Sequence, residues 1–299
     1  MDIYSELKSH IASVYKNMPM CEYTTLRIGG PADILVEAGS VDDIVFTQKT
    51  AKKYKLPLFA LGRGSNILVG DKGIRGIVLH LGKNFESLSV KENCIYAEAG
   101  AMLSCLAKFA AENSLKGLEF SGGIPGTVGG AVIMNAGAYG GEMKDVVEYV
   151  DFSDKDGNVL RYSSEEMDFN YRHSSLQGNG SIVLGVGFSL EKGDIKQIKE
   201  TILELNRRRA AKQPLDKPSC GSVFKRPEGN YAAALIENCE LKGLRIGGCS
   251  VSTKHAGFII NDGNCTAKEY IDLIHTVQER VYKATGYKLE TEVRLVGEF

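Results

Sequence analysis

The sequence predicts an α+β protein of two or three domains. The chain has 299 residues, which is enough for that number of domains and for a substantial core. Segments with strand patterns outnumber those with helical patterns up to about residue 190. Beyond the Lys192-Gly193-Asp194 turn, long charged helices become prominent. We therefore place a domain boundary near residue 190.

The overall composition is that of an ordinary globular protein. Hydrophobic residues make up 43% of the chain and charged residues 24%, with a formal net charge of −1. Nucleic-acid binders carry concentrated basic surfaces, so we expect no nucleic-acid partner. The first residues lack the apolar core of a signal peptide, and no run approaches the ~20 apolar residues that span a bilayer. We expect a cytoplasmic protein with no membrane partner.

The cysteines give no sign of cross-linking. The chain has seven, an odd number, and none forms a Cys-x-x-Cys pair. This spacing predicts neither a disulfide framework nor a zinc site, and we expect no metal. Reduced, buried thiols in a cytosolic protein are the better interpretation.

Apolar periodicity and turn signals define the elements of the first part of the chain. Ser40 should cap a helix, because Asp43 follows three residues later. Asp156-Gly157 is a strong hairpin signal between two strands. Helices are predicted over residues 2–17, 40–54 and 100–113, and strands over 33–37, 57–61, 76–81, 94–99, 146–153, 159–163 and 181–190.

The last part of the chain is predicted to be richer in helix. A helix over 195–212 has an apolar stripe of Ile195, Ile198, Ile202 and Leu205. Further helices are predicted over 232–239 and 267–284, and strands over 257–261 and 292–297. Strand alternation would place Glu290, Glu292 and Arg294 on one face, where solvated charge is the simplest interpretation.

The most unusual stretch covers residues 120–141. Eight of its 22 residues are glycine, and none is charged. Each interior glycine costs a helix about 1 kcal/mol relative to alanine, so we predict a folded loop rather than a helix. Several apolar side chains argue against a flexible linker. A bare backbone with many N–H groups is typical of phosphate binding.

A second glycine-rich segment, residues 62–66, directly follows the predicted strand 57–61. It matches neither the Gly-x-Gly-x-x-Gly fingerprint nor a Walker loop. A structural turn would explain any one of its glycines. Two such loops in one chain favour phosphate binding, and they could hold the diphosphate of a dinucleotide between them.

Two further segments carry chemically useful side chains. Tyr171-Arg172 lies between predicted strands, where an arginine is either a solvated charge or a bidentate clamp for a carboxylate. Ser222 has no Gly-x-Ser-x-Gly elbow around it, so a hydrolase triad is not expected. Cys220 could be a nucleophile, although a cysteine without an evident partner is more often simply buried.

Eight short motifs follow one another in a fixed order along nearly the whole chain. They are Thr24–Gly30, Leu61–Leu68, Gly123–Gly130, Asn135–Tyr139, Tyr171-Arg172, Gly221–Lys225, His255–Asn261 and Glu292–Arg294. In their joint order and spacing they closely resemble the UDP-N-acetylenolpyruvoylglucosamine reductase family of flavoenzymes. Single motifs are weak, but the combination is highly specific.

The resemblance implies an α+β fold. It would consist of an FAD-binding unit of the para-cresol methylhydroxylase (PCMH) type, made of two α+β subdomains, and a C-terminal α+β substrate-binding domain. We expect the first FAD-binding subdomain over residues 1–85, the second over 86–190 and the substrate-binding domain over 191–299.

The resemblance also implies the residues that bind the cofactor, non-covalent FAD. The two glycine-rich loops would hold its diphosphate and ribityl chain. The expected contacts are Thr25, Gly62, Arg63, Gly64, Ser65, Asn66, Gly123, Ile124, Pro125, Gly126, Val128, Gly129, Gly130, Asn135 and Gly137.

The implied reaction reduces the enolpyruvyl ether of UDP-N-acetylglucosamine to UDP-N-acetylmuramate, a step of peptidoglycan precursor synthesis. NADPH would donate the hydride, and FAD would transfer it. By position in the family, Arg172 supplies positive charge at the substrate carboxylate. Ser222 would donate the proton, and Glu292 would add a hydrogen bond.

Substrate contacts are expected from Tyr171, Lys212 and Lys225. Only ten residues lead from Arg172 to the strand at Ile182, so the chain resembles the subgroup without an extra tyrosine-bearing loop. Arg226 is a departure, because other members can carry asparagine at this position.

Two alternative functions stay open. The chain could be another PCMH-type flavin oxidoreductase, such as an oxidase of small alcohols. It could also be a non-catalytic flavin or nucleotide-sugar binding protein, although a binder needs no proton donor.

Overall fold

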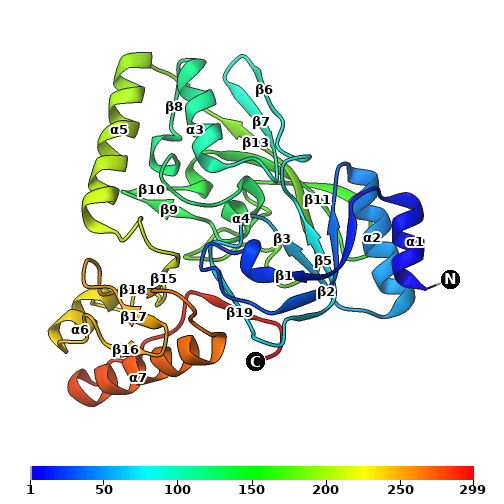
Figure 1. Cartoon of the computed structure of the whole chain (residues 1–299). Coiled ribbons are helices and arrows are strands. Elements are labelled where there is room, and N and C mark those ends of the chain that lie inside the picture. Colours follow the sequence, from blue (N-terminus) through cyan, green and yellow to red (C-terminus); the bar gives the residue numbers. More distant parts are fainter. Residues whose placement is uncertain (1) are drawn as a thin grey trace. The chain divides into compact units, whose positions relative to one another are not determined.

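The chain passes repeatedly between two structural units in the computed structural model, which describes residues 2–299 (Figure 1). The first unit comprises the residues up to Lys16, Ile34–Arg63 and Gly76–Arg209. The second comprises Asn17–Asp33, Gly64–Arg75 and Ala210–Phe299. Each unit has its own cluster of buried apolar side chains. The predicted division into three domains stays a prediction.

The first unit contains most of a four-stranded sheet of order β1-β2-β5-β3, with α1 and α2 as its helices. The elements are α1 Ile3–His10, β1 Val14–Pro19, β2 Pro31–Glu37, α2 Val41–Tyr54, β3 Leu58–Leu61 and β5 Ile74–His80. The predicted cap of α2 is confirmed, because the Ser40 side chain accepts a hydrogen bond from Asp43 N. β3 and β5 are parallel.

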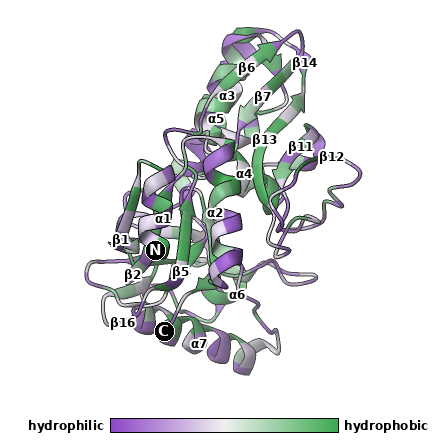
Figure 2. Cartoon of the chain, turned by 90° about the vertical axis from the view of Figure 1, so that its right-hand side faces the viewer, coloured by the Kyte–Doolittle hydropathy of each residue, from purple (hydrophilic) through white to green (hydrophobic). Residues whose placement is uncertain are grey.

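A five-stranded sheet of order β12-β11-β13-β7-β6 completes the framework of this unit. Its central strand β13 is almost entirely buried and hydrophobic (Figure 2). The buried side chain of Gln48 joins α2 to this sheet, since it accepts from Ser153 Oγ at 2.6 Å and donates to Asp154 O at 2.8 Å. The strands are β6 Leu88–Lys91, β7 Cys94–Glu98, β11 Val147–Ser153, β12 Val159–Ser163 and β13 Ile182–Ser189.

Shorter elements surround the second sheet. They are α3 Leu103–Glu112, β8 Leu115–Lys116, α4 Val128–Ile133, β9 Gly137–Ala138, β10 Gly141–Glu142 and β14 Glu191–Lys192, with 3-10 turns at Glu119–Ser121 and Met143–Asp145. The long helix α5 (Ile195–Lys212) follows, and it belongs to the first unit as far as Arg209. Of its predicted apolar stripe only Ile198 is fully buried, and the other three side chains are half-buried.

The second unit is built on a four-stranded antiparallel sheet of order β15-β18-β17-β16. Helix α7 packs against β16 and β17 through a stripe that includes Tyr270, Leu273 and Val277. A parallel pair, β4 with β19, joins the 64–75 segment to the end of the chain. The elements are β4 Ile67–Val69, β15 Ser219–Ser222, α6 Ala232–Asn238, β16 Arg245–Ile246, β17 Cys249–Val251, β18 Phe258–Asn261, α7 Ala267–Thr285 and β19 Arg294–Val296, with a 3-10 turn at Met20–Glu22. Within residues 2–299, none of the helices is long and apolar enough to cross a membrane.

The predicted N-terminal helix over residues 2–17 is wrong in its second half. Helix α1 ends at His10, and the chain continues as β1, which lies beside β2 in the sheet. The apolar residues Ile11 and Val14 fit the helical period, but both are buried in the core of the unit. Tertiary pairing therefore overrides the local pattern here.

The prediction of uniformly reduced, buried thiols is also wrong. A disulfide bond joins Cys249 and Cys265, while Cys94 and Cys105 are exposed. The pairing follows from the β17–β18 register, in which Cys249 faces Asn261, four residues before Cys265. No local motif marks such a pair, because the sheet rather than the spacing brings the two residues together.

Candidate functional site

The residues predicted to act in binding and catalysis are divided between the two units. The first unit contains Gly62, Arg63, Gly123, Ile124, Pro125, Gly126, Val128, Gly129, Gly130, Asn135, Gly137, Tyr171 and Arg172. The second contains Thr25, Gly64, Ser65, Asn66, Lys212, Ser222, Lys225 and Glu292.

The glycine-rich stretch is not entirely a loop, because its residues Val128–Ile133 form helix α4. This corrects the prediction from glycine content. A Cβ on Gly129 would lie 2.9 Å from Ala99 Cβ, so only glycine lets the helix approach β7 this closely. The packing of α4 against β7 and β13 offsets the propensity cost of about 1 kcal/mol for each glycine.

The backbone amides of this stretch divide into two groups. The first two amides of α4 are used within the unit, where they donate to carbonyl oxygens of the 99–101 segment. By contrast, the N–H groups of Gly123, Thr127 and Gly130 donate to no acceptor among residues 2–299. Gly123 is half-buried and Thr127 is buried, where amides are normally paired, whereas Gly130 presents its amide at the exposed surface. Together the three N–H groups suit an anionic ligand.

Glycine also keeps the surface of this stretch bare. Gly130 is exposed, and a Cβ there would meet only Thr127 Oγ1, at 3.6 Å. A Cβ on Gly62 would collide with that same hydroxyl, so Gly62 lies against the 120–141 stretch within this unit. The structure thus brings Gly62 and Thr127 together, as a shared ligand of the two loops requires.

Tyr171 and Arg172 form the tip of a tight turn. The flanking residues Asn170 and His173 exchange two backbone hydrogen bonds, each of 3.1 Å. Arg172 has the left-handed φ of 56°, and its guanidinium carbon lies 5.0 Å from the centre of the Tyr171 ring. The turn therefore presents both side chains from a fixed backbone.

This turn is attached to the end of the glycine-rich stretch. Ser174 Oγ donates to Ile133 O at 2.9 Å, and Asn135 Nδ2 donates to Asn170 O at 3.1 Å. The Asn135 amide also donates to Glu142, and its oxygen accepts a backbone N–H. The fully buried side chain of Asn135 thus holds the Arg172 turn against the end of the glycine-rich stretch, and its expected contact with FAD stays a prediction.

Sequence analysis missed Arg209, a cation beside this stretch. A Cβ on Gly123 would lie 3.2 Å from Arg209 Cδ. Arg209 Nε is buried and has no hydrogen-bond partner among residues 2–299. Burial lowers the pKa of this guanidinium. Arg209 continues the apolar stripe of α5 one step beyond Leu205, and a charge in that position was the available signal.

In the second unit, Thr25 connects the 64–66 segment to strand β15. Its Oγ1 donates to Ser219 O of β15 at 2.7 Å, and its amide donates to Gly64 O at 3.2 Å. Gly64 has φ of 63°, and a Cβ there would collide with Tyr23 O. Only glycine allows this approach, which fixes the 64–66 segment next to Thr25.

Ser222 and Glu292 lie close together in the same unit. Glu292 N donates to Val223 O at 2.7 Å, which places Glu292 beside the residue that follows Ser222. Asn66 Nδ2 donates to Glu292 O at 3.2 Å. Gly221 has φ of 79° at a register shift of β15, and such bulges redirect the side chain that follows.

The predicted strand over 292–297 is shorter in the structure. β19 begins at Arg294, while Thr291 instead forms an antiparallel bridge with Phe224. The chain changes pairing partner between Thr291 and Arg294, and the expected single face of Glu290, Glu292 and Arg294 stays a prediction. This change is what aligns Glu292 with the end of β15.

Three basic side chains of the second unit, Lys212, Lys225 and Arg226, have different surroundings. Lys225 Nζ lies 3.3 Å from Glu290 Oε2. Lys212 is exposed at the end of α5. The Arg226 guanidinium carbon stacks 4.1 Å from the centre of the Tyr231 ring.

Cys220 is a buried thiol and not a nucleophile. Its side chain is 2% exposed, and its sulfur lies 3.2 Å from Tyr270 Oη. Burial raises the pKa of this thiol to about 11. The thiolate, which is the reactive form of cysteine, is therefore disfavoured at neutral pH.

We expect the cysteines of the native protein to differ in their rates of reaction with thiol reagents. At neutral pH the exposed Cys105 should be alkylated quickly, whereas Cys220 should react only after unfolding. Peptide mass spectrometry after timed alkylation measures both rates. Labelling of native Cys220 at the rate of Cys105 would contradict the assignment of Cys220 as inert.

Comparison with known families agrees with this arrangement. A family model described as "FAD binding domain" matches residues 32–163. A second, described as "UDP-N-acetylenolpyruvoylglucosamine reductase, C-terminal domain", matches residues 213–296. Fold and matches together define an FAD-binding flavoprotein with the PCMH-type α+β fold. The predicted fold class is therefore confirmed.

Full-length relatives identify the family. The UDP-N-acetylenolpyruvoylglucosamine reductase of Caldanaerobacter subterraneus is 50% identical over 285 residues, which are 95% of this chain and 94% of that protein. That of Alkaliphilus oremlandii is 49% identical over 280 residues, 94% and 92% of the two chains. The crystal structure of the reductase from Thermus caldophilus matches with a TM-score of 0.83 at 36% identity, over 95% of this chain and 98% of that chain. The chain belongs to the UDP-N-acetylenolpyruvoylglucosamine reductase family, as its sequence motifs predicted.

Proposed function

We infer that the chain is an FAD-dependent reductase that converts UDP-N-acetylglucosamine enolpyruvate to UDP-N-acetylmuramate with NADPH, in peptidoglycan precursor synthesis. The observation that carries this conclusion is the near full-length match to reductases of this name at about half identity. The predicted catalytic residues also lie in defined backbone settings: Arg172 in a hydrogen-bonded turn, and Ser222 directly after the register shift at Gly221.

We propose that the unpaired amides of the glycine-rich stretch bind the diphosphate of FAD. Gly123, Thr127 and Gly130 supply N–H donors on a bare surface, which fits two phosphate groups. Arg209 adds positive charge next to Gly123. Gly62 and Arg63 in the first unit, and Thr25 and the 64–66 segment in the second, complete the proposed FAD contacts.

The substrate carboxylate needs a cation, because negative charge spreads into it during the reaction. FAD, when bound and reduced by NADPH, would supply a hydride for the enolpyruvyl methylene carbon. Arg172 is proposed to neutralise the charge that develops, since a guanidinium can pair both carboxylate oxygens. Its strained, hydrogen-bonded turn holds the backbone in place before substrate arrives.

The neighbouring carbon then needs a proton. Ser222 is proposed as the donor, because the bulge at Gly221 redirects its side chain at the end of β15. A serine hydroxyl is a weak acid, but the carbanion-like carbon that receives the proton is strongly basic. Glu292 is proposed to add a hydrogen bond to the substrate. Tyr171, Lys212 and Lys225 are proposed substrate contacts. The two lysines would also be cations near the Ser222 alkoxide that forms when the serine gives up its proton.

Replacing Arg172 by lysine should reduce kcat/KM by about 10²–10³, because lysine keeps the charge but cannot form the bidentate pair. The matched control is Arg208→Lys, an exposed arginine paired with Glu204 on α5. Steady-state NADPH oxidation at varied substrate concentration measures the effect. Equal kcat/KM values for the two variants would contradict the proposed role of Arg172.

One assay separates the reductase from the two alternatives. NADPH oxidation that depends on UDP-N-acetylglucosamine enolpyruvate is expected of the reductase. A non-catalytic binder would show none, and an alcohol oxidase would instead consume oxygen with its own substrate. Release of FAD on denaturation tests the expected non-covalent attachment. The cytoplasmic location and the lack of nucleic-acid, membrane and metal partners stay predictions.

A further inference from the structure

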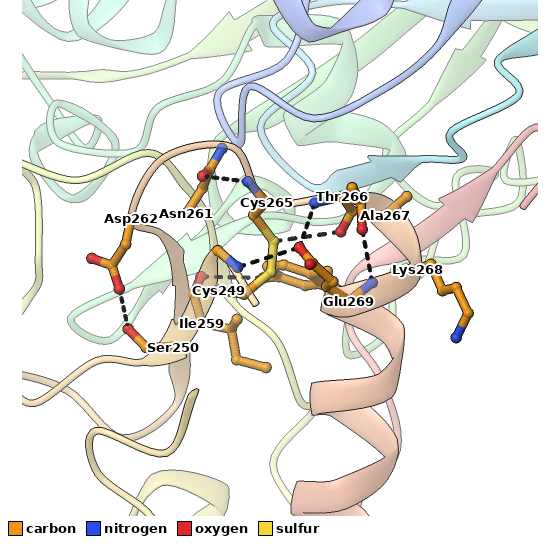
Figure 3. The surroundings of a disulfide bond; sticks show 12 residues. Cys249, Ser250, Ile259, Asn261, Asp262, Cys265, Thr266, Ala267, Lys268 and Glu269 are labelled. Atoms are coloured by element: carbon orange, nitrogen blue, oxygen red, sulfur yellow. Dashed lines mark hydrogen bonds between the residues drawn. A yellow bond between two sulfur atoms is a disulfide. The ribbon is translucent and has the colours of Figure 1, made fainter. Parts of the chain in front are cut away.

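The disulfide bond in the second unit connects the start of the inner strand β17 to the residue before the N-cap of α7 (Figure 3). It joins Cys249, the first residue of β17, to Cys265, which immediately precedes the N-cap of α7. The two Cα atoms are 5.3 Å apart, within the usual range for a disulfide. Cys249 is fully buried and Cys265 is 7% exposed, so Cys265 is the more accessible of the two residues.

The turn closed by this disulfide is organised by the buried side chain of Asn261. Its Oδ1 accepts from Gly263 N at 2.9 Å and from Cys265 N at 3.3 Å. Its Nδ2 donates to Leu26 O at 3.1 Å. One amide side chain therefore connects the disulfide turn directly to the 24–28 segment.

That segment contains Thr25, which connects β15 to the second glycine-rich loop. The hydrogen bonds from Thr25 to Ser219 and Gly64 were described above. The disulfide turn is thus two hydrogen-bonded steps from a proposed FAD contact, by way of Asn261 and Leu26. A change in the conformation of the disulfide turn can therefore reach the proposed FAD contact Thr25 through these hydrogen bonds.

We propose that the Cys249–Cys265 disulfide is a thiol–disulfide switch that sets how tightly the protein holds FAD. The inference rests on the proposed position of Thr25 at the cofactor. Where thiols keep a compartment reducing, a protein disulfide is usually transient or redox-sensing rather than permanent. With the disulfide formed, the turn holds the Asn261 side chain in place. With the disulfide reduced to two thiols, the turn holds Asn261 less firmly.

The switching step is an exchange with a small-molecule thiol. A thiolate attacks Cys265 Sγ, which forms a mixed disulfide and releases Cys249 as a thiolate. A second thiol then attacks the sulfur of the small molecule, releases Cys265 and leaves as the oxidised small-molecule disulfide. Two electrons and two protons pass to the protein, and the reverse exchange closes the switch.

The test measures FAD dissociation constants for the oxidised and the reduced full-length protein by fluorescence titration of the apoprotein. Reduction should raise the dissociation constant about 5- to 150-fold, the usual range of coupling between sites. The Cys249→Ser/Cys265→Ser variant should match the reduced form under all conditions. Cys105→Ser removes an exposed thiol and should keep the full redox response. Circular dichroism confirms that each form is folded.

A second comparison tests the route through Asn261. In an Asn261→Leu background, opening the disulfide should no longer change FAD affinity, because the connection to Leu26 is already lost. A redox response that persists in this background overturns the route. Equal FAD affinity of oxidised and reduced wild type overturns the switch. A divalent metal held by the two thiolates and Glu269, whose ligand atoms lie within 4.8 Å of one another, would also overturn it.

Thr25→Ala distinguishes failure of the switch from failure of the proposed FAD site. If this variant weakens FAD binding while the redox state has no effect, the switch is wrong and the site stands. If redox state matters but Thr25→Ala binds FAD normally, the proposed contact and the route through it are both wrong.

Discussion

Ser222→Ala is expected to slow reoxidation of the reduced flavin by substrate about 10²–10⁴-fold, while NADPH still reduces the flavin at the wild-type rate. Loss of a positioned acid typically costs this much, and the effect falls only on the half-reaction that needs the proton. Stopped-flow absorbance of the flavin measures the two half-reactions separately. This split is informative, because general damage to the protein would slow both.

The matched control for this variant is Ser219→Ala on the same strand. Ser219 accepts from Thr25 through its backbone oxygen, so removal of its hydroxyl should leave that bond intact. Both variants should retain FAD and wild-type flavin reduction. If Ser222→Ala reoxidises as fast as Ser219→Ala, another group supplies the proton and the assignment fails.

Gly130→Val is expected to give a folded but colourless protein. Gly130 is exposed, and an added Cβ meets nothing closer than Thr127 Oγ1 at 3.6 Å, so the fold has room for the side chain. The same side chain would cover the bare backbone that we propose faces the FAD diphosphate. Flavin absorbance per mole of purified protein, together with a thermal melt, measures both effects.

Gly129→Val provides the structural contrast. Its side chain would enter the packed face of α4 against Ala99, so this variant should lose stability as well as flavin. Gly130→Val should instead melt close to the wild-type apoprotein. A fully yellow Gly130→Val protein would show that the diphosphate lies elsewhere.

The elements that sequence analysis predicted correctly are those with strong local signals. The Ser40 cap begins α2 as expected, and Asp156-Gly157 joins β11 to β12. The errors arise where distant residues decide the structure. Val14 fits a helix by period but is buried in a strand, and α4 contains glycines that only its contact with Ala99 explains.

In the candidate site, too, some features could be predicted from the sequence, whereas others depend on contacts between distant residues. Ser222 and Glu292 could be named from the motifs of the family, because their order and spacing along the chain are characteristic. Their proximity could not be derived by pattern, since it depends on a bulge at Gly221 and on backbone pairing seventy residues away along the chain. Arg209 was missed for a related reason: its importance comes from its neighbour, Gly123, and not from its own sequence context.

The parallel pairing of β19 with β4 has a consequence for synthesis on the ribosome. Residues 67–69 leave the exit tunnel early, yet their partners at 294–296 are among the last to be made. All of the first unit is complete by Arg209, so it can begin to fold while translation continues. β4, in the 64–75 segment, must wait without its partner strand until the end of the chain is made. Chaperone contact during this interval, and aggregation when translation stalls beyond Arg209, should therefore concentrate on β4.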